Sequence, residues 1–545
     1  MTFPRPGRSM CCPSFSHSRR LRSMNRSFGG VWLAGLAWAC VVLIAAQAPA
    51  EVRLPAVFSS NMVLQRQQPV PIWGQADPGE RVTVQFAQQT RTTTADQSGN
   101  WRVQLDPLPA STEPATLVVQ ASNRISLDNV LVGEVWLCSG QSNMDWVLAN
   151  TDNGQAAIAA ADHPHIRLFF VPRKIRSPGS DIDSTWQVCT PETIKPFSAV
   201  GYYFGRELHQ SLKVPIGLIH SSWGGTQAEA WTPEAYLLAN QELRACVERS
   251  QQWQQQRPRV QAEFDAAIVQ WQQQVQQAKA QGRPEPPRPR EPDAIRPQRI
   301  AASLWISMLQ PMVPFAIRGA VWYQGESNEA RAQQYRILLP TMIRAWRDAW
   351  GYEFPFGIVQ LPNYRAPSTQ PDDTPWSHLR DAQLFTFKTV PNTGLIVTID
   401  IGEGNNIHPK NKLDVGRRLA RWALESVYNQ DAGGKSGPIY ASSRIEGNRV
   451  IIKFDEVGSG LAVRDGGGQL QEFAIAGEDR QWHWATARII SKDEVEVYSD
   501  QVPNPMAVRY AWNSNPKNPN LTNSSGLPAS PFRTDDWPGP TDGKR

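Results

Sequence analysis

Residues 135–144, "VWLCSGQSNM", carry the clearest structural signal in this sequence. A continuous apolar run ends abruptly at 139–143, in small, hydroxyl and amide residues, just before a segment with helical character. An unbroken apolar run of this length is typical of a strand buried on both faces of a parallel sheet. Such sheets bind ligands beyond the carboxyl ends of their strands. The turn is therefore either a plain connection between elements or the position of a nucleophile at the sheet edge.

The same pattern continues after this stretch. Apolar runs alternate with long helical patterns, which favours an α/β domain over residues 131–430, with a parallel sheet covered by helices on both faces. The expected strands are 134–138, 166–171, 214–220, 317–323, 356–361 and 393–400. The expected helices are 199–213, 329–351, 377–388 and 409–429.

Different patterns flank and interrupt this domain. Short alternating segments with turn residues between them predict a small β-sandwich-like domain over 51–130. β signals return over 431–545, where loops dominate the last thirty residues. Within the α/β domain, residues 238–300 are glutamine-rich and then proline-rich, which indicates a helical protrusion followed by an extended return.

Residues 1–50 are interpreted as a signal peptide preceded by an upstream extension, 1–23. Arg26 precedes an apolar segment over 31–46, and "APA" at 48–50 has the small-x-small pattern of a cleavage site. The apolar segment is short for a membrane span. We therefore expect a periplasmic or secreted protein with no membrane span after cleavage.

Charge and cysteine content narrow the function classes. Without the six arginines of the leader, Lys+Arg falls from 55 to 49 against 50 acidic residues, a net charge of −1. A near-neutral chain makes nucleic acid a poor partner. Cys138, Cys189 and Cys246 remain, without metal-ligand spacing, and neither a zinc pattern nor a nucleotide-binding motif occurs. We therefore expect neither a metal nor a cofactor.

Four polar stretches fall at the ends of predicted strands, namely 139–143, 221–226, 324–328 and 401–408. The carboxyl ends of parallel strands meet at one edge, so we expect these stretches to converge. Ester hydrolysis needs a nucleophile, a base and donors for the oxyanion. Ser142 can be the nucleophile and His408 the base, because imidazole has the side-chain pKa nearest neutrality. Taken singly, each stretch is also compatible with an ordinary turn.

Several groups at this edge could donate hydrogen bonds to an oxyanion. The backbone N–H of Ser142 and that of Gly224 or Gly225 can point into one pocket. An amide side chain, from Gln324 or Asn328, can supply a third donor. Glu326 is interpreted as a carboxylate that supports its loop. His220, beside the glycine turn, is interpreted as a pocket-wall or core residue.

The same stretches resemble a known family. "GQSNM" (140–144), "SWGGT" (222–226), "RGAVWYQGESN" (318–328) and "IHPKNKLDVGRRLA" (407–420) are similar to blocks of sialate O-acetylesterase-type enzymes of the SGNH hydrolase superfamily. The similarity runs from "LPAVFSSNMVLQR" to "LPASPFRTDDW", over essentially the whole chain after the leader. The resemblance implies a flavodoxin-like α/β hydrolase domain with β-rich flanking domains, and removal of O-acetyl groups from sugars. It also implies Ser142 as nucleophile, His408 as base, and Gly225 with Gln324 as oxyanion donors.

One position departs from the family pattern. Many SGNH enzymes carry an acid three residues before the histidine, but Asn405 stands there in this chain. Asp400, at the end of an expected strand, is the first replacement considered, and Glu403 is the second. A Ser-His dyad, with the imidazole held by a backbone carbonyl, is the third alternative.

The leading hypothesis is a secreted carbohydrate O-acetylesterase that acts through a serine acyl-enzyme. Sialic acid, xylan and xyloglucan all stay open as the acetylated substrate, because a fold does not determine a substrate. The alternatives are a non-catalytic carbohydrate-binding protein on the same scaffold, and a short-chain lipase or thioesterase. Neither the oligomeric state nor the role of the flanking domains follows from the sequence.

Overall fold

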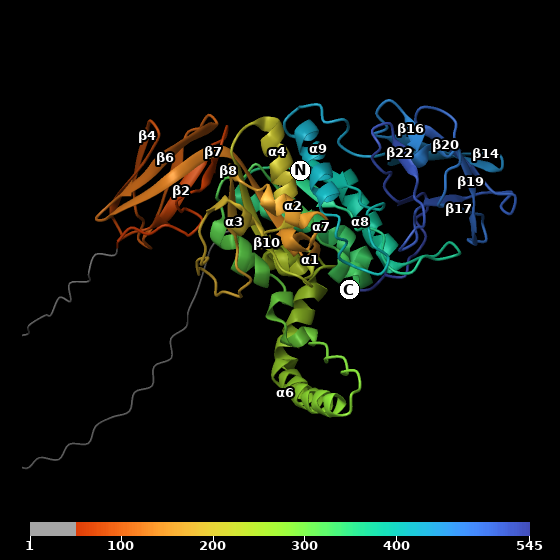
Figure 1. The fold of residues 1–545 in the computed structure, drawn as a ribbon, viewed down its shortest axis with the longest axis horizontal. Coiled ribbons are helices and arrows are strands. Elements are labelled where there is room, and N and C mark those ends of the chain that lie inside the picture. Colours follow the sequence, from red (N-terminus) through yellow and green to blue (C-terminus); the bar gives the residue numbers. More distant parts are fainter. Residues whose placement is uncertain (1–50) are drawn as a thin grey trace, which may run out of the picture. The chain divides into compact units, whose positions relative to one another are not determined.

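A parallel sheet positions the polar stretches identified above (Figure 1). The computed structural model describes residues 51–545, so the predicted leader, 1–50, lies outside the described residues. The strands of this sheet are β7 (Arg124–Gly140), β8 (His163–Phe170), β9 (Gln187–Cys189), β10 (Ile216–Ser222), β11 (Gly319–Tyr323), β12 (Phe356–Val359) and β13 (Thr393–Ile396). Every residue of β10, β11 and β12 is buried, as expected for strands that are covered on both faces.

The strand order places β7 in the middle of the sheet. The strands run β13-β12-β11-β7-β10-β8, all parallel, and β9 pairs antiparallel with β8 at one edge. When β8 and β9 are set aside, the order β10-β7-β11-β12-β13 is the 2-1-3-4-5 order of doubly wound sheets. The order reverses between β7 and β11, and ligands of such sheets bind at this switch point. The polar turns after β7 and β11 lie there.

Helices cover both faces of the sheet, and tryptophans fill the two layers. Trp136 of β7 contacts Phe204 of α4 and Trp422 of α9. Trp322 of β11 contacts Trp346 of α7. Gly319 of β11 is in register with Trp136, and side chains alternate along a strand, so Trp322 lies on the opposite face from Trp136. The helices are α1 (Ser142–Asp145), α2 (Gly154–Ala159), α3 (Pro191–Ile194), α4 (Ala199–Leu212), α5 (Glu234–Ala239), α6 (Arg244–Ala280), α7 (Ala332–Trp350), α8 (Pro375–Thr389) and α9 (Leu413–Ser426).

Most of the N-terminal strands join the same sheet. The N-terminal strands are β1 (Val63–Gln65), β2 (Val70–Gln75), β3 (Arg81–Phe86), β4 (Gln89–Thr94), β5 (Asn100–Leu105) and β6 (Ser111–Gln120). Strands β1, β3, β4 and β6 belong to the central sheet, whereas β2 and β5 pair with each other in a separate sheet. The side chains of β3 and β5 alternate between buried and less buried, which fits one core-facing side. The first half of β7 pairs with β6 and β1, and its second half pairs with β10 and β11. One continuous strand therefore belongs to both regions across residue 130.

The C-terminal region contains short antiparallel strands. They are β14 (Ile439–Glu446), β15 (Arg449–Asp455), β16 (Leu461–Val463), β17 (Phe473–Ala476), β18 (Trp482–Trp484), β19 (Thr486–Ile489), β20 (Glu494–Tyr498), β21 (Ala507–Tyr510), β22 (Leu521–Asn523) and β23 (Phe532–Arg533). Phe532 is buried against Tyr440, Phe454 and Tyr510, so aromatic packing links several of these strands.

The glutamine-rich interruption forms α6, which extends away from the helices around the sheet (Figure 1). Its buried residues, Cys246, Val247 and Ser250, lie near its first turns. The proline-rich return runs back along the helix, where Trp271 donates a hydrogen bond to the carbonyl of Pro286 at 2.9 Å. Within residues 51–545, no helix is both long enough and apolar enough to cross a membrane.

Candidate active site

Ser142 and His408 meet at the carboxyl edge of the sheet. Ser142 is the first residue of α1, directly after β7, and His408 lies in the loop between β13 and α9. The Nε2 atom of His408 lies 2.8 Å from the Oγ atom of Ser142, although the residues are 266 positions apart. Both side chains are half-buried. The structure therefore brings together the two residues that the sequence selects as nucleophile and base.

The composition of the turn after β7 has a steric cause. Gly140 has φ +142°, and a Cβ atom there would lie 2.2 Å from the carbonyl oxygen of Tyr323 on the neighbouring strand β11. The N–H of Gln141 donates to that same carbonyl at 3.0 Å. Because only glycine fits this close approach, residue 140 must lack a side chain where β7 ends before α1.

The imidazole of His408 is oriented by an aromatic ring. Trp146 stacks on it, with the ring centroids 5.1 Å apart and the planes 18° from parallel. Within residues 51–545, the Nδ1 atom of His408 has no hydrogen-bond partner. Burial, and next the positive charge of Lys412, hold the pKa of His408 below its ordinary value of 6.5. His408 is therefore neutral, and able to accept a proton, over a wider pH range than a free imidazole.

Asp400 is paired elsewhere. Its two oxygens accept hydrogen bonds from the guanidinium of Arg418, on α9, at 2.7 Å each, and Arg464 lies 3.1 Å from one of them. Burial disfavours the charged carboxylate, but these guanidinium groups outweigh it and hold the pKa of Asp400 below 3.8. The structure does not bring Asp400 to His408, because a bidentate arginine satisfies this carboxylate.

Glu403 supports the histidine loop through the backbone. One of its oxygens accepts a hydrogen bond from the N–H of Lys410 at 2.7 Å, and the other accepts one from the Asn406 side chain at 3.1 Å. Asn406 in turn bonds both the N–H and the carbonyl of His408, at 3.0 and 2.9 Å. Glu403 and Asn406 therefore shape the loop that presents the imidazole, and neither contacts its Nδ1 atom.

The glycine turn after β10 lies against Ser142. A Cβ atom on Gly224 would lie 3.2 Å from the Cβ of Ser142, and Gly225 has φ +71°, a conformation that favours glycine. Among the described residues, the N–H groups of Ser142, Gly224 and Gly225 have no backbone or side-chain acceptor. They are donors next to Ser142 that stay free for an oxyanion.

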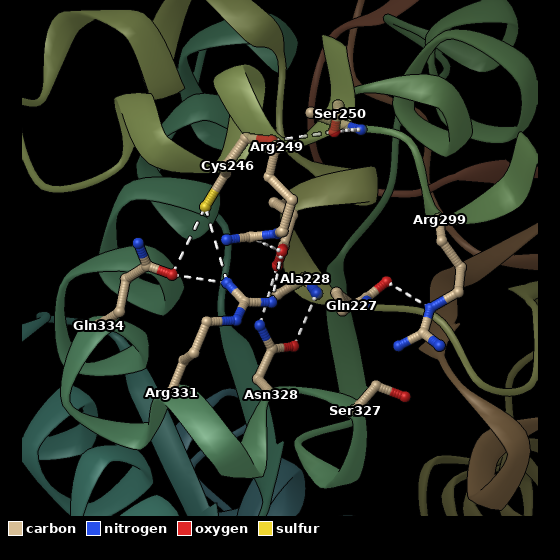
Figure 2. Close-up of polar contacts among 12 residues, drawn as sticks. Gln227, Ala228, Cys246, Arg249, Ser250, Arg299, Ser327, Asn328, Arg331 and Gln334 are labelled. Carbon is tan, nitrogen blue, oxygen red and sulfur yellow. Dashed lines mark hydrogen bonds and ion pairs between the residues drawn. The ribbon is translucent and has the colours of Figure 1, made fainter. Parts of the chain in front are cut away.

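The two predicted amide donors are already hydrogen-bonded, to each other and to the segment after β10. The side-chain nitrogen of Gln324 donates to Asn328 Oδ1 at 2.7 Å and to the carbonyl of Thr226 at 3.2 Å. The side-chain nitrogen of Asn328 donates to Glu229 at 2.8 Å, and its oxygen accepts from the N–H of Ala228 (Figure 2). Because an amide nitrogen has two protons, an oxyanion would have to displace one of the partners of Gln324.

A buried carboxylate that the sequence did not single out anchors this loop. Glu229 accepts hydrogen bonds from Arg249 of α6 at 2.8 Å and from Arg331 at 2.6 Å, in addition to the one from Asn328. Burial opposes its charge, yet the two guanidinium groups lower the pKa of Glu229 to about 2. Figure 2 shows Arg249 of α6 converging with Asn328 and Arg331, which both follow β11. This ionic cluster joins the base of α6 to the loop after β11.

Asn143 is a second residue that sequence reasoning missed. Its side-chain nitrogen donates to Glu326 at 2.6 Å and to the carbonyl of Ile407 at 3.0 Å. Asn143 follows the serine and Ile407 precedes the histidine, so this amide links the two halves of the site. Glu326 supports the site through Asn143, in line with its interpretation as a structural carboxylate. The available signal was the position of Asn143 within the "GQSNM" block.

Cysteines and metal-ligating clusters do not contribute to this edge. Cys138, Cys189 and Cys246 are free and buried, and burial raises the pKa of Cys189 and Cys246 to about 12. Residues 51–545 contain no group of three or more His, Cys, Asp or Glu side chains arranged to hold a metal ion. The arrangement at Ser142 and His408 suits acyl transfer by side chains and backbone donors.

Comparison with known proteins gives a consistent picture. A family model described as "Carbohydrate esterase, sialic acid-specific acetylesterase" matches residues 132–281 and 301–425. The match covers Ser142, the glycine turn, the loop after β11 and His408. Residues 282–300, which include the proline-rich return, fall between the two matched segments.

Relatives resemble this chain over most of its length. Human sialate O-acetylesterase is 27% identical over an alignment of 533 residues, with 89% of this chain and 94% of that protein covered. The mouse sialate O-acetylesterase is 27% identical over 527 residues, with 88% and 94% covered. The crystal structure of a carbohydrate acetylesterase from Xanthomonas citri is similar at 37% identity and a TM-score of 0.75, over 89% of this chain and all of that one.

Proposed function

The chain belongs to the sialic acid-specific acetylesterase family of carbohydrate esterases, and we propose that it removes O-acetyl groups from sugars through an acyl-enzyme on Ser142. One observation carries the proposal, namely the 2.8 Å contact between the Oγ of Ser142 and the Nε2 of His408. A serine hydroxyl is a weak nucleophile until a base accepts its proton, and this contact supplies the base.

The reaction proceeds in two steps. The Oγ of Ser142 attacks the acetyl carbonyl while its proton passes to the Nε2 of His408, and the imidazolium then protonates the departing sugar oxygen. Water attacks the acetyl ester, again with His408 as base, and acetate leaves. The free N–H groups of Ser142 and of Gly224 or Gly225 stabilise the oxyanion in both steps. Gln324 can join them only if its amide turns away from Asn328 or Thr226.

The geometry favours a Ser-His dyad over a triad. Asp400 is satisfied by Arg418, and Glu403 bonds the loop backbone, so neither carboxylate is placed to orient the imidazole. The stacked ring of Trp146 provides an orientation in place of the backbone carbonyl considered from the sequence. Asp400 and Glu403 stay in the proposal only as residues that stabilise the loop and α9.

The same proposal has three further parts. They are that the chain belongs to the SGNH superfamily, that its leader directs export, and that its substrate is an acetylated sugar. The 2-1-3-4-5 strand order and the placement of Ser142 after the central strand support the superfamily assignment. The apolar segment at 31–46 with its cleavage pattern supports export to the periplasm or outside. Relatives named for sialate and for carbohydrate support an acetylated sugar as substrate.

A panel of acetylated glycans tests the function. Purified protein is incubated with O-acetylated sialic acid, acetylated xylan and acetylated xyloglucan, and released acetate is measured. We expect acetate from at least one glycan, and a preference for acetyl over longer acyl groups on p-nitrophenyl esters. Binding of these glycans without acetate release would favour the non-catalytic carbohydrate-binding alternative. Preference for acyl chains beyond about four carbons would favour a lipase or thioesterase.

A further inference from the structure

A buried lysine lies beside the proposed site, and the mechanism above gives it no role. Lys412, the residue before α9, is 1% exposed. Its Nζ donates to the Oδ1 of Asn143 at 2.5 Å and lies 5.4 Å from the centre of the Tyr323 ring. Within residues 51–545 no carboxylate forms an ion pair with it. Burying an ammonium without a direct counter-charge is costly, so the position of Lys412 calls for a function.

The partner of Lys412 connects the nucleophile with the base. The amide of Asn143 meets Lys412 on its oxygen, and Glu326 and the carbonyl of Ile407 on its nitrogen. An ammonium can only donate, so it fixes which end of the amide is the oxygen. The nitrogen must then point toward Ile407, whose neighbour is the base. Lys412 thereby determines the orientation of the group that ties the two catalytic segments together.

We propose that Lys412 is a positioning residue of the hydrolytic site, which fixes the contact between Ser142 and His408 through the side chain of Asn143. The inference rests on the proposed roles of those two residues. It accounts for a site in which no carboxylate meets the Nδ1 atom of the base. In other serine hydrolases a triad acid holds the imidazole at the correct distance from the serine. Here Asn143 holds the backbone beside the histidine instead, through the carbonyl of Ile407.

The charge of Lys412 has a second consequence, for the pH dependence. Glu326 and Glu403 are the acidic groups that face Lys412 and favour its charged form, but burial outweighs them and lowers its pKa to about 7. Lys412 is therefore charged in weakly acidic solution, where it disfavours a second positive charge on His408. Because the base must be neutral to act, activity should extend below the ordinary histidine pKa of 6.5.

Kinetics across an acid-to-alkaline pH series test the proposal. The kinetic parameters kcat and KM for p-nitrophenyl acetate are measured for wild type, Lys412→Met and Lys410→Met. Lys410 is exposed and two residues from His408, so its substitution removes the same charge without touching Asn143. We expect Lys412→Met to lower kcat by about tenfold to a hundredfold, since misplacement of about 1 Å can cost 10²-fold, with little change in KM.

The pH limb separates this role from a purely structural one. In Lys412→Met the acid limb of kcat/KM should move to higher pH, by up to about one unit, while Lys410→Met should match wild type. Lys412→Arg keeps the positive charge. The pH position of its acid limb should therefore return toward the wild-type position more fully than its kcat returns toward the wild-type value. Matching profiles of Lys412→Met and Lys410→Met would overturn the proposal.

Wild type alone provides an independent measurement if the variants do not fold. Its acid limb should lie below pH 6.5, the ordinary histidine value, because burial and then the charge of Lys412 lower the pKa of His408. A limb at or above that value would overturn the effect of the Lys412 charge on the base. The two proposals can also fail separately. Full activity in Ser142→Ala would end the proposed mechanism, whereas an inactive Ser142→Ala with a normal Lys412→Met would end only the role of Lys412.

Discussion

The carboxyl edge of the sheet holds two serine–histidine contacts, Ser142 with His408 and Ser222 with His220. Ser222 ends β10 in register with Gly140 at the end of β7, so the two serines lie at the ends of neighbouring strands. In the second pair the Nε2 of His220 lies 2.6 Å from the Oγ of Ser222, which also donates to Asp145 at 3.3 Å. The second pair thus has a serine, a histidine and a carboxylate, and the first pair has no acid.

Burial distinguishes the two pairs. Ser222 and His220 are 0% and 1% exposed, whereas Ser142 and His408 are half-buried. Burial, and next the charge of Arg173, lower the pKa of His220 to about 3, so it cannot take up a proton near neutral pH. The free backbone donors surround Ser142. Access and free backbone donors, more than a neighbouring carboxylate, therefore distinguish the proposed nucleophile from the buried serine.

The largest expected effect separates the serines. Ser142→Ala should lower kcat for acetyl ester hydrolysis by at least about 10³-fold, because loss of the nucleophile leaves only binding and oxyanion stabilisation. Ser222→Ala, the matched control from the buried pair, should change kcat little and lower the melting temperature. Wild-type-like turnover in Ser142→Ala would show that Ser142 is not the nucleophile. Loss of activity confined to Ser222→Ala would assign that role to the buried pair.

A smaller effect is expected from the turn between the two serines. In Gly224→Ala the new methyl group would lie 3.2 Å from the Cβ of Ser142 and push the two backbones apart. We expect kcat to fall by about tenfold to a hundredfold with KM nearly unchanged, because the oxyanion donors are displaced. An unchanged kcat in a folded variant would show that this turn does not contribute to the oxyanion site.

Asp400→Asn asks whether a carboxylate away from both histidines matters for catalysis. We expect kcat to fall less than tenfold, and the free energy of unfolding to fall by about 2 kcal/mol, because Arg418 loses its charged partner. Denaturant unfolding measures the second quantity. The stability difference should be full above the ordinary aspartate pKa of 3.8 and should fade as the pH falls below it, since the folded pKa is lowered. A large loss of kcat at unchanged stability would restore Asp400 as a triad acid.

The sequence predicted the elements of the sheet and the meeting of Ser142 with His408. Apolar runs and helical periods predicted bounds close to those of β10, α4 and α8, because burial on both faces and along one helix face leaves periodic signals. The predicted strand 134–138 is only part of β7, which begins at Arg124. Because the carboxyl ends of parallel strands lie at one edge of a sheet, Ser142 and His408 could be predicted to lie close together although they are 266 positions apart.

The remaining partners could not be predicted, because they depend on side-chain directions across the fold. Nothing in the sequence shows that Arg418 satisfies Asp400, that Trp146 stacks on His408, or that Gln324 turns toward Asn328. Asn143 and Lys412 lay within recognised blocks, but their contact joins positions 269 apart. Such buried polar pairs leave no periodic pattern.

Covalent labelling shows directly which serine His408 activates. Wild type, Ser222→Ala and His408→Gln are treated with a fluorophosphonate, and the modified residue is identified by peptide mass spectrometry. We expect a phosphonyl adduct on Ser142 in wild type and Ser222→Ala, and little or none in His408→Gln, because the serine then lacks its base. An adduct on another serine, or unchanged labelling of Ser142 without His408, would contradict this expectation.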